Sequence, residues 1–85
     1  MGAAPMSRQT LRKPATLDQA IGRRIIEARR IARLSQENVA ADLGTTHQTI
    51  QRYERGTARI RASQLWKIAQ STGCDVTFFF DGMPR

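Results

Sequence analysis

The stretch QENVAADLGTTHQTIQRY, residues 36–53, has the spacing of two short helices joined by a tight turn. Gln36, Ala40, Gly44 and Ile50 stand at relative positions 1, 5, 9 and 15 of this stretch. The arrangement needs a small residue where one helix crosses the other, a glycine where the chain turns, and an aliphatic side chain in the angle between the helices. The stretch therefore predicts a helix-turn-helix.

Capping residues extend this prediction along the chain. Ser35 and Thr46 precede the two helices of the motif, as helix N-caps do. Thr16 precedes an amphipathic segment that continues to about Arg33, where apolar residues recur at helical spacing. A further amphipathic helix is predicted over 62–71. These features favour helices throughout the central part of the chain.

The short apolar segment at 76–80 is predicted as a fifth helix, because a lone strand would have no partner here. The expected fold class is therefore all-α, a compact domain of five helices without a sheet. This domain is expected to span 16–82. A flexible basic N-terminal tail, 1–15, and a C-terminal tail, 83–85, are expected on either side of it.

The composition narrows the class of function. Of the 85 residues, 14 are Lys or Arg and 7 are Asp or Glu, which gives a formal net charge of +7. Arginine dominates the cations, and its guanidinium suits phosphates and guanine edges. A basic chain of this size indicates a polyanionic partner, with a merely solvated basic surface as the alternative.

Several other classes of function are excluded by what the sequence lacks. A single Cys excludes an intramolecular disulfide framework, and a single His, His47, leaves no second imidazole to complete a metal site. The sequence contains neither a phosphate-binding glycine loop nor a membrane-length apolar run. We expect a protein that is not an enzyme, has no metal or other cofactor, does not span a membrane, and is located in the cytoplasm.

A resemblance to a known family supports the helix-turn-helix prediction. The matching stretches include IGRRI at 21–25, LSQE at 34–37, LGTT at 43–46 and YERG at 53–56. With them the chain resembles the Cro and CI phage-repressor DNA-binding domains, the XRE-type helix-turn-helix group. The resemblance implies a lambda-repressor-like five-helix domain that acts as a homodimer on a roughly two-fold double-stranded DNA operator. It also implies a bacterial or phage protein that is associated with the nucleoid. Arg33 departs from the family because Gly often ends the first helix there, so a strained conformation or an early helix end is expected.

The second helix of the motif is the expected recognition helix, the one that contacts the bases. In such proteins its N-terminal residues enter the major groove and meet base edges. Gln48 suits adenine N6 and N7, and Arg52 suits guanine O6 and N7. The alternative is a plain solvated helix face. The predicted base contacts are Thr46, His47, Gln48, Thr49, Gln51 and Arg52.

Phosphate contacts are expected on both sides of this helix. Gln36 matches the family's phosphate contact at the start of the first motif helix. Arg55, Arg59 and Arg61 flank the end of the second motif helix and are expected to hold the DNA backbone there.

The resemblance also implies a structural pair. Arg29 lies beside the apolar stripe of the first helix, and Glu54 lies at the end of the recognition helix. In the family the matching residues form a partly buried ion pair that joins these two helices.

Three consecutive phenylalanines near the end of the chain predict an interface. Neighbours on a helix point about 100° apart, so a small domain does not easily bury all three. We predict a two-fold dimer through Trp66, Phe78, Phe79 and Phe80. The alternative is that two of the rings cap the core and the third is merely exposed.

The function that these features favour is a sequence-specific DNA-binding transcriptional regulator, most simply a repressor that inserts helix 46–54 into the major groove. Two alternatives remain open from the sequence. One is an antitoxin-type regulator that also binds a partner toxin protein, and the other is an interaction module that does not bind DNA.

Overall fold

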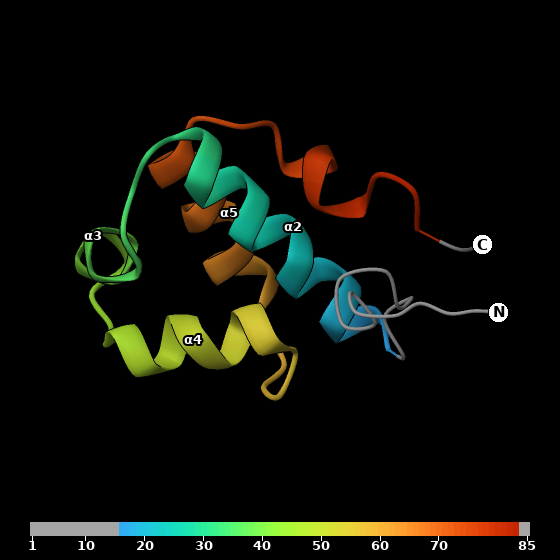
Figure 1. The fold of residues 1–85 in the computed structure, drawn as a ribbon, viewed down its shortest axis with the longest axis horizontal. Helices are drawn as coiled ribbons and strands as arrows, with labels where there is room; N and C mark the ends of the chain where they lie inside the picture. Colours follow the sequence, from blue (N-terminus) through green and yellow to red (C-terminus); the bar gives the residue numbers. More distant parts are fainter. Residues whose placement is uncertain (1–15, 84–85) are drawn as a thin grey trace, which may run out of the picture.

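The computed structural model describes residues 16–83 (Figure 1). Within this range the fold is all-α, as predicted. The α-helices are α2 (Leu17–Ile31), α3 (Gln36–Leu43), α4 (His47–Arg55) and α5 (Ala62–Thr72), and a 3₁₀-helix, η1 (Val76–Phe80), follows them. The predicted N-terminal tail, 1–15, lies outside the described residues, as do the last two residues of the predicted C-terminal tail.

The prediction of five helices is corrected to four α-helices and a 3₁₀-helix within the described range. The segment between Asp75 and Asp81 is too short for more than a tight turn. The backbone N–H of Phe78 donates to the Asp75 carbonyl at 2.9 Å, and that of Asp81 donates to the Phe78 carbonyl at 3.3 Å. Asp75 also caps η1. Its carboxylate accepts hydrogen bonds from the backbone N–H of Thr77 and from the Thr77 hydroxyl, and these bonds, the first more than the second, hold the pKa of Asp75 below its ordinary value.

Local sequence determines where the helices begin and end. The side chains of Thr16, Ser35 and Thr46 accept hydrogen bonds from the third residue of the helix that each precedes, as predicted. Gly44 has a φ of 71°, the left-handed conformation that reverses the chain between the motif helices. The first helix ends at Ile31, earlier than the predicted limit.

Arg33 adopts the strained conformation that its place in the sequence predicts. Its φ is 61°, and it is the one residue other than glycine with a positive φ in the described part of the chain. The backbone N–H of Leu34 donates to the Arg29 carbonyl at 3.0 Å, so the turn closes over the end of α2 despite the strain.

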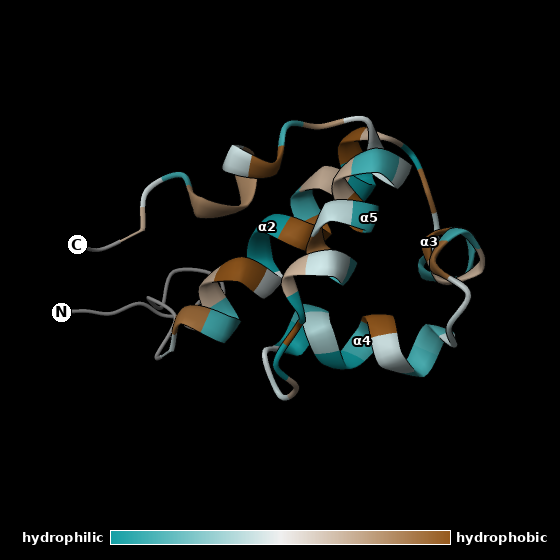
Figure 2. Cartoon of the chain, turned by 180° about the vertical axis from the view of Figure 1, so that it is seen from behind, coloured by the Kyte–Doolittle hydropathy of each residue, from teal (hydrophilic) through white to brown (hydrophobic). Residues whose placement is uncertain are grey.

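The hydrophobic core lies between the helices. In Figure 2 hydrophobic and hydrophilic bands alternate along α2, α3 and α4, as expected of amphipathic helices. Helix α2 packs against α4, α5 and η1, while α3 packs against α4 and α5. The buried hydrophobic residues are Ile25, Ala28, Val39, Ala40, Leu43, Ile50, Leu65, Ile68, Ala69 and Phe79.

A close crossing sets the position of α4 against α2. A Cβ added at Gly22 would lie 2.5 Å from the Glu54 carbonyl oxygen and 2.6 Å from that of Tyr53. Only a residue without a side chain allows the backbones to approach this closely. This contact was not predicted from the sequence, because Tyr53 and Glu54 lie more than thirty positions after Gly22.

Candidate nucleic-acid interface

The outward face of α4 is polar. Successive residues turn by about 100° around a helix, which places Gln48, Arg52 and Arg55 on the arc opposite the buried Ile50 and Gln51 at the flank of that arc. Arg52, Arg55 and Gln48 are exposed and Gln51 is half-buried. None of these four side chains has a hydrogen-bond or ion-pair partner within residues 16–83. The face therefore presents donors and acceptors that the described fold does not use.

The start of α4 combines capping with the other predicted base contacts. The Thr46 hydroxyl accepts from the backbone N–H of Thr49 at 3.3 Å and lies 3.1 Å from the Thr49 hydroxyl. His47 is the first residue of the helix and is half-buried. The six predicted base-contact residues therefore lie on α4 or at its N-cap, only Gln48 and Arg52 project opposite Ile50, and the hydroxyls of Thr46 and Thr49 are already engaged at the start of the helix.

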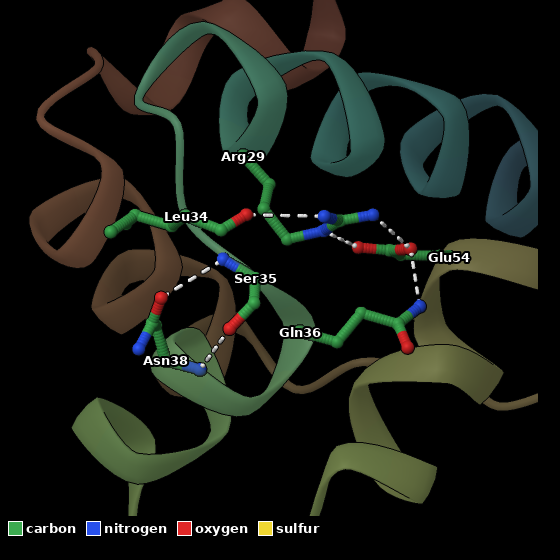
Figure 3. Close-up of polar contacts among 6 residues, drawn as sticks. All are labelled: Arg29, Leu34, Ser35, Gln36, Asn38 and Glu54. Atoms are coloured by element: carbon green, nitrogen blue, oxygen red, sulfur yellow. Dashed lines mark hydrogen bonds and ion pairs between the residues drawn. The ribbon is translucent and has the colours of Figure 1, made fainter.

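A buried polar network joins α2, α3 and α4 (Figure 3). The Nε of Arg29 donates to Glu54 Oε2 at 2.6 Å, and its Nη2 donates to Oε1 at 3.2 Å. The Nη1 of Arg29 donates to the Leu34 carbonyl at 3.1 Å. Glu54 is the buried charged residue in the described chain, and this pairing satisfies it. The ion pair implied by the family resemblance is present.

Gln36 belongs to the same network. Its side-chain Nε2 donates to Glu54 Oε1 at 2.8 Å, and the side chain is half-buried rather than free. The role predicted for Gln36 is a phosphate contact, and this inward contact was not predicted. No local signal reveals it, because the partners are eighteen positions apart.

The first motif helix also has a complete capping box. Ser35 Oγ accepts from the Asn38 backbone N–H at 3.0 Å, and Asn38 Oδ1 accepts from the Ser35 N–H at 3.0 Å. This capping box could have been predicted from the sequence, because Asn38, which has an amide side chain, follows Ser35 by three residues.

The predicted basic residues beyond α4 lie on the surface. Arg55, Arg59 and Arg61 are all exposed. Arg61 occupies the N-cap position of α5 and makes no side-chain capping bond, so the first backbone N–H groups of α5 have no side-chain cap. This end of α5 therefore combines open donors with guanidinium groups on the neighbouring loop.

The predicted dimer residues are not equivalent. Trp66 is 57% exposed and Phe80 is 48% exposed. The prediction is corrected for Phe79, which is fully buried within the described fold because the turn of η1 directs this ring into the core. Phe78 is half-buried and packs edge-on against Phe79, with ring centroids 6.1 Å apart.

Arg24 holds η1 against α2, a role that was not predicted from the sequence. Its guanidinium carbon lies 4.9 Å from the centroid of the Phe78 ring, and its Nη2 donates to the Asp81 carbonyl at 3.0 Å. The Nη1 of Arg24 pairs with Glu27 at 3.1 Å. Arg24 therefore makes its hydrogen bonds and its ring contact within the fold.

Within residues 16–83, no group of three or more His, Cys, Asp or Glu side chains is placed to hold a metal ion. None of the helices in this range combines the length and the apolar character that crossing a membrane requires.

The fold and the polar face of α4 define a helix-turn-helix domain. The chain belongs to the helix-turn-helix family, whose model matches residues 25–79, and this confirms the resemblance seen in the sequence. The chain is 42% identical over 73 residues to an uncharacterized HTH-type transcriptional regulator of Sinorhizobium medicae (strain WSM419), a match covering 86% of this chain and 52% of the relative. It is 38% identical over 69 residues to an uncharacterized transcriptional regulator in the ATPase CF(0) region of Rhodospirillum rubrum, covering 81% of this chain and 64% of the relative.

The chain spans about half the length of the curated relatives it matches most extensively. Among solved structures, it resembles the restriction-modification controller protein C.AhdI from Aeromonas hydrophila with a TM-score of 0.71 and 25% identity, over 74% of this chain and 91% of that one. The clp gene regulator ClgR from C. glutamicum matches with a TM-score of 0.74 over 80% of this chain and 87% of that one, and at 18% identity it shows the shared fold.

Proposed function

We propose that the chain is a sequence-specific double-stranded DNA-binding transcriptional regulator, and that α4 enters the major groove. The observation that carries this proposal is the polar outward face of α4, whose side chains have no partner within the described fold, on a helix whose opposite face is buried. A solvated surface helix does not require this concentration of amide and guanidinium groups. The family membership and the names of the relatives support the same function.

The side chains of α4 have distinct roles in this proposal. Gln48 and Arg52 are exposed and lie one turn apart, so both reach the same groove. Gln48 pairs with an adenine and Arg52 with a guanine. Gln51 and His47 add contacts at the edges, while Thr46 and Thr49 keep the helix start rigid and offer their remaining lone pairs.

In this proposal, residues on both sides of α4 contact the DNA backbone. Arg55, Arg59 and Arg61 are exposed on the side where α5 begins, and the uncapped N–H groups of α5 add donors for a phosphate. Gln36 contacts a phosphate from the start of α3. These contacts set the register of the domain on DNA, and the α4 contacts set the sequence.

The proposed assembly is a homodimer on a roughly two-fold operator, joined through the exposed rings of Trp66 and Phe80. Repression follows most simply if the bound dimer covers a promoter.

Selection of bound duplexes from a random pool tests the proposal. The expected result is an enriched sequence with two inverted half-sites about one helical turn apart, ~34–36 Å. Enrichment of no sequence above the starting pool would refute sequence-specific binding.

A further inference from the structure

Glu54 has more hydrogen bonds than an ion pair with Arg29 requires. Arg29 donates to both carboxylate oxygens, and Gln36 Nε2 donates a third hydrogen bond to Oε1 at 2.8 Å. The Glu54 side chain is 4% exposed, so it does not itself reach a partner outside the fold. The third bond instead connects the end of α4 to the first residue of α3 (Figure 3).

The chemistry of the carboxylate decides how the Gln36 amide is turned. A carboxylate only accepts hydrogen bonds, so the nitrogen of the amide, and not its oxygen, faces Glu54. Figure 3 shows this arrangement, with the Gln36 oxygen pointing away from Glu54. The Nε2 atom carries two protons, and only one of them is used in the described fold.

We propose that Glu54 is a positioning residue for DNA binding, which orients the Gln36 amide so that its second N–H donates to a phosphate. The inference rests on the proposed DNA-binding function. Without Glu54 the amide rotates freely and presents its oxygen to the phosphate as readily as its nitrogen. A phosphate accepts only from the nitrogen, so the orientation itself contributes to affinity.

Arg29 makes this arrangement rigid. Its guanidinium holds Glu54 through Nε and Nη2 and holds the Leu34 carbonyl through Nη1. Leu34 immediately precedes the Ser35 cap of α3. The carboxylate and the start of the helix that carries Gln36 are therefore fixed to the same side chain.

Binding to a random-sequence duplex tests the coupling between Glu54 and Gln36. The variant Gln36→Met, which keeps the length of the side chain, should bind about tenfold more weakly because it loses a hydrogen bond to a charged group. Glu54→Asp retains a carboxylate for Arg29 but is one methylene shorter, which lengthens the hydrogen bond from Gln36, so this variant should weaken binding by up to the same factor. The double variant should bind no more weakly than Gln36→Met, while Gln70→Met, at an exposed site on α5, should bind as the unaltered protein does.

The side-chain amide signals of Gln36 give a second readout that does not depend on the stability of a Glu54 variant. They are assigned by their loss in Gln36→Met. In the free protein one amide proton should be protected from hydrogen exchange, and on addition of duplex the second should shift and become protected as well. Additive losses in the double variant, or a second proton that does not respond to duplex, would overturn the positioning role. If the unaltered protein binds no duplex, the proposed function fails instead, which is a different result.

Discussion

Arg33 stores strain in the turn between α2 and α3. A left-handed conformation costs an L-residue about 1–2 kcal/mol, and Gly avoids this cost while losing more entropy on folding. We therefore expect Arg33→Gly to raise the free energy of unfolding in urea by about 0.5–1 kcal/mol. The matched control is Arg30→Gly, which lies within α2 and should lower the free energy of unfolding by about 1 kcal/mol. Destabilisation by Arg33→Gly would show that the side chain makes a stabilising contact that outweighs the strain.

Arg52 and Arg59 are both exposed arginines, yet the proposed interface gives them different effects on DNA binding. Arg52→Ala should lower discrimination at one base pair by ~1–3 kcal/mol, since it removes a bidentate contact to a base edge. Arg59→Ala should weaken binding to all sequences alike, because it removes a phosphate contact. The slope of the logarithm of the binding constant against the logarithm of the salt concentration should become shallower by about one. Titrations of operator and random duplex at several salt concentrations separate the two. Equal losses on both duplexes for Arg52→Ala would contradict a base contact.

At the scale of elements, the crossing of α2 and α4 depends on Gly22. Alanine there would raise helix propensity by about 1 kcal/mol, but its Cβ would overlap the carbonyl oxygens of Tyr53 and Glu54. These are backbone atoms, so relief requires the two helices to separate. We expect Gly22→Ala to lower the free energy of unfolding by about 1–3 kcal/mol in urea. The opposite change at an exposed helical site, Ala41→Gly, measures the propensity contribution alone, and a stabilised Gly22→Ala would show that the crossing can relax at no cost.

The helix limits were predictable because their determinants are local. Thr16, Ser35 and Thr46 cap helices through hydrogen bonds to residues three positions away, and Gly44 reverses the chain through its own φ. Both partners of each such hydrogen bond lie within four consecutive residues, so the sequence alone indicates them. The core stripe of α3 and the buried Ile50 of α4 follow from periodicity in the same way.

The remaining features depend on contacts between distant segments. Which of three consecutive phenylalanines is buried depends on how η1 docks, and Arg24 of α2 sets that docking through Phe78 and the Asp81 carbonyl. The inward turn of Gln36 depends on Glu54, which folding brings to it from another helix. For the candidate site, the sequence was therefore enough to place the candidate residues on or beside one helix, but not to predict the contact between Gln36 and Glu54.

The exposed cationic and aromatic side chains lie on different elements of the molecule. The exposed arginines proposed to meet DNA lie on α4 and the segment that leads to α5, while the exposed rings lie within α5 and η1. The part of the chain after Arg61 is formally neutral, with Lys67 and Arg85 set against Asp75 and Asp81. A dimer formed through that part of the chain would therefore join segments that carry no net charge.

A dimer through Trp66 and Phe80 makes a prediction about assembly. Because both side chains are exposed, the double variant Trp66→Ser, Phe80→Ser should keep the protomer fold while shifting the sedimentation of micromolar protein towards monomer, with at least about tenfold weaker association. It should also lose the preference for paired half-sites, since each monomer then binds alone. The control is Ile31→Ser, which removes an apolar side chain that is 72% exposed at the end of α2 and should leave association unchanged. A clean monomer for the unaltered protein, both free and on operator, would refute the dimer, and dissociation by Ile31→Ser alone would move the interface to α2.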